Sequence, residues 1–248
     1  MTADMREKLI IAAVGFLLTG VLGAMATTFI QQRGWMWQNR VGKIEKDTQN
    51  ALGAYQSVSD LVNARWHAEY RIVSAIEHNV DDEEWKGARD EYVSADRDWA
   101  IKFTSAARDV AFYVDTPFAI SASDRMKLVW PLPCDSYALG GAIDASSARL
   151  VLEVVNHCSG LVKEQIDKAT TYLAKAAPKL ADADRKAFTD LAYKRLDALY
   201  RTNETLRCVI FTRALAMRGY LNVDGFWGAY FGLDDPSYKA PDTKSCVG

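Results

Sequence analysis

Residues 8–40 read KLIIAAVGFLLTGVLGAMATTFIQQRGWMWQNR, and they determine how the rest of the chain is interpreted. From Leu9 to Ile30 there are 22 residues without a charge. Because a helix rises about 1.5 Å per residue, this segment reaches about 33 Å and can cross a hydrocarbon core of roughly 30 Å. A buried helix of a soluble protein seldom contains so long an uncharged run. The sequence therefore predicts a transmembrane anchor over residues 1–33.

A cleaved signal peptide is the alternative interpretation of the same segment. Such a peptide needs an apolar centre of only about 7–15 residues, followed by small residues at the cleavage site. Ala24-Met25-Ala26 fits the small-x-small pattern, and Arg6 and Lys8 provide a basic start. The apolar run nevertheless continues beyond this site, which favours an anchor that is retained.

Aromatic and basic residues stand where the apolar segment ends. Arg33, Trp35 and Trp37 are expected to mark the membrane boundary, because indole rings prefer the membrane–water interface and a basic residue anchors the helix end. The stretch FIQQRGWMWQNR at 29–40 resembles small bacterial single-pass inner-membrane proteins that have a helical domain of unknown function. The resemblance implies a bacterial inner-membrane setting and carries no functional residues across.

The basic residues around the anchor give two opposing indications of its orientation. Arg6 and Lys8 precede the anchor, and four basic residues follow it. Those four are Arg33, Arg40, Lys43 and Lys46. Flanking Lys and Arg tend to stay in the cytoplasm, so the count favours a cytoplasmic main domain. Short basic amino termini often stay inside as well, which would place the domain in the periplasm.

The composition fits one globular domain attached to the anchor. The chain has 248 residues, of which 49% are hydrophobic and 25% are charged. The formal net charge is −2, so no broad basic surface indicates nucleic-acid binding. The partners that the sequence predicts are the lipid bilayer and either other membrane-protein subunits or further copies of the same chain.

After the anchor, apolar residues recur at steps of three and four, which is the period of a helix with one apolar face. The anchor is expected to continue into the first helix, with a candidate kink at Gly34, and Asp81 or Asp82 is expected to cap the second. We therefore predict an all-α fold in which residues 34–220 form an antiparallel four-helix bundle and 221–248 a tail rich in Gly and aromatic rings. The predicted helices span about 35–79, 82–115, 136–176 and 182–219, with a short helix at 123–129.

The four cysteines, Cys134, Cys158, Cys208 and Cys246, form no C-x-x-C motif. In the cytoplasm all four would be thiols, and this state agrees with the orientation that the charge count favours. In an exported domain an even number would suggest two disulfides. Cys134 and Cys246 both lie in predicted loops, so a bridge between them that ties down the tail is the candidate disulfide.

The sequence predicts no catalytic, cofactor-binding or metal-binding residues. A di-iron carboxylate site needs Glu-x-x-His motifs, and none of the three histidines, His67, His78 and His157, has a Glu three residues before it. Neither a G-x-x-x-x-G-K-[ST] phosphate loop nor a G-x-S-x-G motif is present. We therefore expect a protein that is not an enzyme.

The stretch FWGAYFG at 226–232 is the most distinctive part of the tail. Its rings Phe226, Trp227 and Tyr230 would cap the end of the bundle, contact a partner or lie at the membrane surface, because aromatic rings are favoured at all three.

Two functions fit these features. The first is a non-enzymatic single-pass membrane protein whose helical bundle is an accessory or scaffold subunit of a membrane complex. The alternative is a membrane-anchored, sensor-like four-helix bundle that binds a small ligand outside the cytoplasm.

Overall fold

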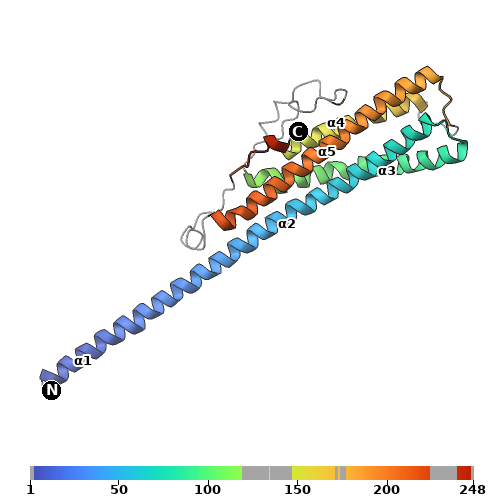
Figure 1. Ribbon diagram of the computed structural model, residues 1–248. Coiled ribbons are helices and arrows are strands. Elements are labelled where there is room, and N and C mark those ends of the chain that lie inside the picture. Colours follow the sequence, from blue (N-terminus) through green and yellow to red (C-terminus); the bar gives the residue numbers. More distant parts are fainter. Residues whose placement is uncertain are drawn as a thin grey trace. The chain divides into compact units, whose positions relative to one another are not determined.

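A computed structural model shows the chain as a set of helices (Figure 1). Every regular element in the described ranges is helical, and none of these ranges contains a strand. The predicted all-helical fold class is therefore confirmed for this part of the chain. The short helix predicted at 123–129 lies outside the described residues. The described residues are 3–118, 134, 147–170, 173, 177–223 and 239–246.

The N-terminal part of the chain is helical in three consecutive elements. α1 spans Ala3–Phe16, a π-helical turn spans Leu17–Val21, and α2 spans Leu22–Glu77. α2 continues through Gly34, the candidate kink, and the departure from α geometry lies in the π turn.

This helix is the one element among the described residues that is long and apolar enough to span a membrane. The apolar side chains of its N-terminal segment, which include Leu9, Phe16 and Ile30, are exposed. The hydroxyls of Thr19, Thr27 and Thr28 each donate to the carbonyl four residues earlier, at 2.6, 2.8 and 2.9 Å. Such internal hydrogen bonds lower the cost of placing a hydroxyl in hydrocarbon.

α3 spans Asp82–Val110 and starts as predicted at an aspartate cap. The Asp81 carboxylate accepts a hydrogen bond from the backbone N–H of Glu84 at 2.9 Å. The helix then passes through a π-helical turn, Ala111–Asp115, and a 3-10 turn, Thr116–Phe118.

α4 spans Ala148–Thr170 and is shorter than the predicted helix 136–176. It ends six residues earlier because Leu173 adopts a positive φ of 61°, and its backbone N–H donates to the Thr170 hydroxyl at 3.0 Å. The part of the prediction over 136–146 lies outside the described residues. α5 spans Asp182–Val223 and begins where predicted, but it continues past Gly219.

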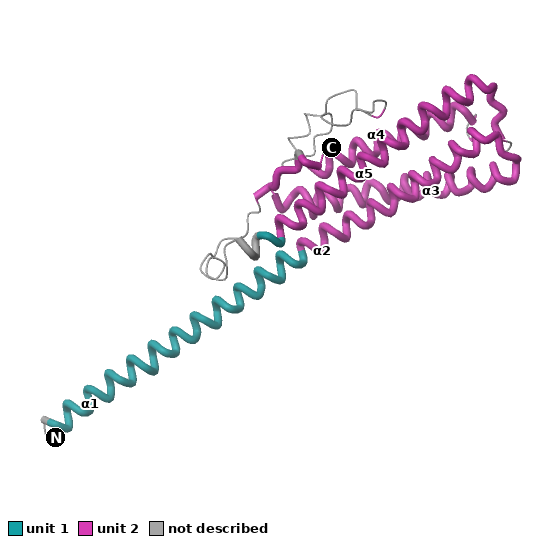
Figure 2. Tube along the Cα trace, viewed as in Figure 1, with its two compact units in different colours: residues 1–46, 218–236 teal, residues 47–217, 237–248 magenta. Residues whose placement is uncertain are grey.

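The chain divides into two compact units (Figure 2). Unit 1 comprises residues 1–46 and 218–236, and unit 2 comprises residues 47–217 and 237–248. The boundaries that the sequence predicts, at 33/34 and 220/221, stay a prediction.

One buried apolar cluster in unit 2 draws side chains from α2, α3, α4 and α5. Burying a large apolar side chain contributes about 1.5–3 kcal/mol, so this cluster holds the four helices in contact. Its largest member, Trp85, is fully buried at the start of α3. The members are Ala68, Ile72, Val73, Ala75, Ile76, Trp85, Ala88, Tyr92, Val162, Ile166, Phe188, Ala192 and Leu196.

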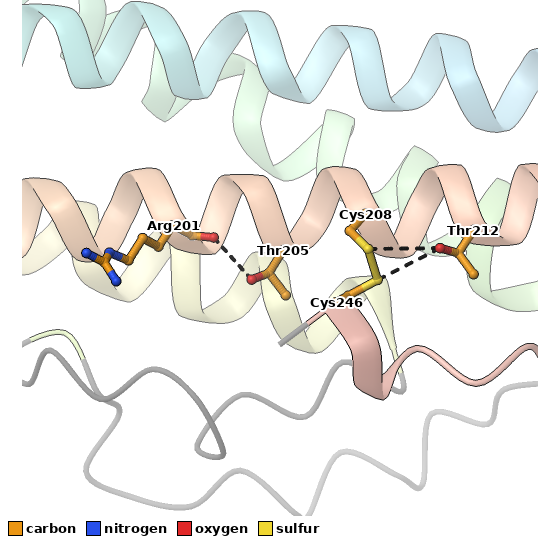
Figure 3. The surroundings of a disulfide bond; sticks show 5 residues. All are labelled: Arg201, Thr205, Cys208, Thr212 and Cys246. Atoms are coloured by element: carbon orange, nitrogen blue, oxygen red, sulfur yellow. Dashed lines mark hydrogen bonds between the residues drawn. A yellow bond between two sulfur atoms is a disulfide. The ribbon is translucent and has the colours of Figure 1, made fainter. Parts of the chain in front are cut away.

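Two disulfides join all four cysteines, so the predictions of free thiols and of a Cys134–Cys246 bridge are wrong. Cys134 pairs with Cys158 on α4, and Cys208 on α5 pairs with Cys246 in the 3-10 turn Lys244–Cys246. Their Cα atoms lie 5.3 and 5.5 Å apart. Figure 3 shows Cys246 beside α5, where the Thr212 hydroxyl lies 3.8 Å from its sulfur. The loops bond to helices and not to each other.

Candidate functional site

A buried ionic cluster crosses the interior of unit 2 between α2, α3 and α4. Arg65 and Glu69 stand one turn apart on α2, and the Arg65 Nε atom donates to the Glu69 Oε1 atom at 2.6 Å. The Arg65 Nη1 atom donates to Asp96 on α3 at 2.5 Å. The Ser159 hydroxyl on α4 donates to the same Glu69 oxygen at 3.0 Å. The cluster therefore links three helices by charge-assisted hydrogen bonds.

Asp96 lies at the edge of the cluster, where it is shared by two cations. Lys163 on α4 donates to its second oxygen at 2.6 Å. Burial alone would raise the pKa of Asp96, but the hydrogen bonds from Lys163 and Arg65 outweigh burial and lower it. Asp96 therefore stays ionised at neutral pH.

Glu69 is fully buried, and its Oε2 atom has no hydrogen-bond partner among the described residues. Burial raises the pKa of Glu69 to about 7, although Arg65 and Ser159 act against this shift. The Arg65 guanidinium also lies over the ring of Tyr92, 5.1 Å from its centroid. Burial raises the pKa of Tyr92 as well, so this phenol stays neutral.

The raised pKa of Glu69 predicts that unit 2 becomes more stable as the pH falls from about 7 to 4.5. In this range the folded state keeps a proton that the unfolded state has released, and above about pH 7 both states are ionised. The difference corresponds to about 3 kcal/mol in the free energy of unfolding. Urea unfolding followed by circular dichroism at pH 5 and pH 7.5 measures it.

Glu69→Gln is expected to remove this pH dependence, whereas Glu164→Gln is expected to keep it. Glu164 is an exposed carboxylate whose pKa is lowered by the hydrogen bond from Lys168, so it titrates below this range. If the free energy of unfolding changed equally with pH in the wild type and in Glu69→Gln, Glu69 would not be the group that causes the pH dependence.

A groove of about 490 Å³ lies between α3 and α4, next to the ionic cluster. Trp99 connects the two features, because it lines the groove while its ring centroid lies 5.9 Å from the Arg65 guanidinium. The Trp99 and Phe103 rings stack at 4.1 Å, and the Trp99 Nε1 atom donates to Asn156 at 3.2 Å. These contacts fix the aromatic wall. The lining residues are Trp99, Ala100, Phe103, Thr104, Ala107, Arg108, Ala111, Arg149, Leu152, Glu153 and Asn156.

The rim of the groove carries two cations and one anion. Arg149 and Glu153, one turn apart on α4, form an ion pair at 3.3 Å. Arg108 on α3 is exposed and forms no ion pair with another described residue. The groove therefore combines an apolar wall with one net positive charge.

A second buried ion pair holds the start of α4. Asp115, at the end of the π turn after α3, accepts hydrogen bonds from the Ser147 hydroxyl at 2.9 Å and from the backbone N–H of Ala148 at 3.0 Å. Arg213 on α5 donates to the same carboxylate. A carboxylate at a helix N-terminus is favoured by the helix dipole, so Asp115 fixes one end of the groove.

The sequence-predicted membrane residues lie on α2 in unit 1. The Arg33 guanidinium lies over the Phe29 ring at 5.0 Å, Trp35 is exposed, and Trp37 is half-buried. Their role at a membrane boundary stays a prediction. The three rings predicted to cap the bundle or contact a partner, Phe226, Trp227 and Tyr230, lie outside the described residues.

None of the three histidines lines the groove. His67 contacts the ring of Trp66 at 5.0 Å, and the His78 Nδ1 atom lies 2.8 Å from the carbonyl of Ser74. Within the described ranges, no group of three or more His, Cys, Asp or Glu side chains is arranged to hold a metal ion.

The comparisons with known proteins give no relative. No family model, curated protein or solved structure matches the chain.

Sequence reasoning missed Arg65, Glu69, Asp96 and Lys163. A signal was present, because Val62, Arg65, Glu69 and Ile72 follow one another at steps of three and four. When an arginine and a glutamate stand one turn apart between apolar residues of the same helix face, they indicate a buried ion pair.

Proposed function

We propose that the chain is a non-enzymatic, sensor-like helical bundle that is anchored in a bacterial inner membrane and binds a small ligand outside the cytoplasm. The groove between α3 and α4 carries this proposal. Its volume of about 490 Å³ falls within the roughly 300–1,000 Å³ of small-molecule sites. The wall is aromatic and apolar, and a few polar groups converge on the rim, as in such sites.

The bundle is the arrangement that best explains the buried cluster of unit 2. The short connection between α2 and α3 favours antiparallel neighbours. The apolar cluster and the ionic cluster each bring together residues from several helices, so these helices must lie side by side. The four-helix antiparallel bundle predicted from the sequence therefore remains our proposal for the arrangement.

The two disulfides support a position outside the cytoplasm. Disulfides persist in the periplasm and are rare in the cytoplasm, where thiols are kept reduced. The charge count around the anchor favours the opposite orientation, but the short basic amino terminus agrees with the periplasm. We give the disulfides more weight because both of them fix segments to helices of unit 2.

The chemistry of the groove selects a small amphipathic anion with a flat apolar body. Trp99, Phe103 and Leu152 provide apolar surface, and Arg108 provides a guanidinium that is exposed at the rim. An arginine recognises a carboxylate by two parallel hydrogen bonds. An aromatic carboxylate meets both requirements.

Isothermal titration calorimetry with 2-naphthoate tests the groove on the full-length chain in lipid nanodiscs. We expect Ala107→Trp to weaken binding at least about tenfold, because the new ring fills the groove. Arg108→Gln is expected to weaken binding by roughly tenfold, through the loss of a charge-assisted hydrogen bond. Unchanged binding in both variants would refute the site.

Arg97→Gln is the matched control for Arg108→Gln. Arg97 is also an exposed arginine of α3, but it does not line the groove. The same change of charge at this position is expected to leave the affinity for 2-naphthoate within about twofold. Circular dichroism and thermal unfolding confirm that each variant is folded.

The accessory or scaffold function remains a second candidate. It is favoured by exposed large apolar side chains on α5, which include Phe211 and Leu215. Copurification of another membrane protein with the full-length chain after mild extraction would support it.

A further inference from the structure

Six aromatic side chains form a seam along the junction of α2 and α5. The rings meet in three pairs, each with one ring from α2 and one from α5. From one pair to the next the residue number on α2 decreases while the number on α5 increases, as in antiparallel helices. The Tyr70 and Tyr193 centroids are 5.6 Å apart, those of Trp66 and Tyr200 are 6.1 Å apart, and those of Tyr55 and Phe211 are 5.7 Å apart.

The seam is fixed by hydrogen bonds and by further ring contacts. The Trp66 Nε1 atom donates to the carbonyl of Leu196 at 3.0 Å, and the Tyr193 hydroxyl donates to Glu77 at 2.5 Å. Trp66 also stacks on Tyr70 at 5.3 Å. These rings are therefore held in place before any partner arrives, which lowers the entropy cost of binding.

The outer side of the seam is unusually apolar for a solvent-facing surface. Tyr200 is 50% exposed, Phe211 is 45% exposed and Leu215 is 66% exposed. The positions 200, 211 and 215 are separated by 11 and 4 residues, so they share one face of α5. Exposed tyrosine and phenylalanine on one face are typical of protein interfaces.

The charges beside the seam suit a second copy of the same chain. Asp197 pairs with Arg201 at 2.9 Å, and Glu204 pairs with Arg207 at 3.1 Å. Each pair is neutral within one chain. When a surface meets its own copy around a two-fold axis, unpaired like charges repel one another, and these two ion pairs bring no unpaired charge to the contact.

The size of the seam is also sufficient for a dimer. The 22 steps along α5 from Tyr193 to Leu215 reach about 33 Å, and two adjacent helices are about 20 Å wide. The surface is therefore about 650 Å² per copy, or about 1,300 Å² in total, which exceeds the roughly 1,000 Å² of a specific interface.

We infer that the α2–α5 seam is the interface of a two-fold symmetric homodimer. In this dimer Tyr200, Phe211 and Leu215 of each copy contact the same surface of the other copy. The interface lies on α2 and α5, whereas the ligand groove lies on α3 and α4, so the two proposals stand independently.

Cross-linking at single introduced cysteines tests the interface. All four native cysteines are in disulfides, so an introduced cysteine provides the thiol that a bis-maleimide reagent needs. Leu215→Cys and Tyr200→Cys, in membranes that contain the full-length chain, are expected to yield a covalent adduct of twice the chain mass. Ile101→Cys on α3 is the control, because Ile101 is 68% exposed and thus matches Leu215.

An adduct of twice the chain mass at both seam positions and not at Ile101 supports the dimer. Equal adducts at all three positions, no adduct, or an adduct with a different protein each overturn it. Phe211→Asp provides a second measurement. We expect it to weaken the dimer at least about tenfold by native mass measurement, with an unchanged circular dichroism spectrum. A dimer of unchanged strength would also overturn the inference.

Discussion

Replacing Arg65 by methionine is expected to lower the free energy of unfolding of unit 2 by about 3–5 kcal/mol. The Arg65 side chain is 2% exposed and donates to Glu69, Asp96 and Ser159. Removing one partner of a buried ion pair leaves the other charge in a low-dielectric interior. Glu69 is the group left without its cation, because Asp96 keeps Lys163. The loss of Arg65 raises the pKa of Glu69 further, so taking up a proton at pH 7.5 is part of the cost. Urea unfolding at pH 7.5 measures the effect.

A double variant shows whether the cost comes from the stranded charge. Arg65→Met together with Glu69→Leu replaces both partners by apolar side chains of similar size, and such replacements of buried pairs are often neutral or stabilising. We therefore expect the double variant to recover most of the lost stability. A double variant as unstable as Arg65→Met alone would indicate that packing, and not charge, makes Arg65 important.

Hydrophobic periodicity was sufficient to predict the helices but not which face of α2 is buried. The pattern places Trp66 and Tyr70 on the apolar stripe, yet Tyr70 is exposed and Trp66 only half-buried. Arg65 and Glu69 are buried instead. A prediction based on apolar residues alone misses Arg65 and Glu69, although the spacing of these two charged residues continues the apolar stripe. Tyr and Trp rings at the edge of a helix junction also follow the apolar spacing, so a pattern of apolar residues does not distinguish them from core residues.

The connections were harder to predict than the helices. The disulfide partners depend on which loops reach which helices, and the sequence does not contain that information. Asp115 was recognised as the end of a helix, but its hydrogen bonds to Ser147 and Arg213 need three segments that are distant in the sequence. The groove depends on the same packing, because its wall comes from two helices that a long connection separates.

Trp99 contacts both the ionic cluster and the groove. It lines the groove, and its ring centroid lies 5.9 Å from the Arg65 guanidinium. Asp96 stands three residues before Trp99 on α3, so it is one turn away on the same side of the helix. A ligand that moves Trp99 would therefore also affect Arg65, and through Arg65 the surroundings of Glu69, the buried carboxylate whose pKa is about 7. Coupling of this kind requires that the ligand bind the two protonation states with different affinity.

Reducing both disulfides is expected to lower the free energy of unfolding by about 7 kcal/mol. The bridges close segments with sequence separations of 24 and 38 residues, and loops of this length correspond to about 3–4 kcal/mol each. The two loops do not overlap, so their effects should add. Urea unfolding with and without a phosphine reductant measures the loss. The variant in which Cys134 and Cys158 are both alanine should reproduce half of the effect and respond to reductant only through the remaining bridge.

For the proposed membrane-anchored protein, the redox state of the cysteines shows on which side of the membrane unit 2 lies. In intact cells, a maleimide that does not cross the membrane should label the chain only after an equally impermeant reductant has been added. Labelling of the chain in lysed cells without reductant would mean that the cysteines are thiols in the cell, and it would place unit 2 in the cytoplasm. The proposed sensor function depends on the first outcome, because a domain in the cytoplasm would not meet a ligand from outside. Reduced thiols would also leave Cys246 unattached to α5, so the C-terminal segment would lose its covalent link to unit 2.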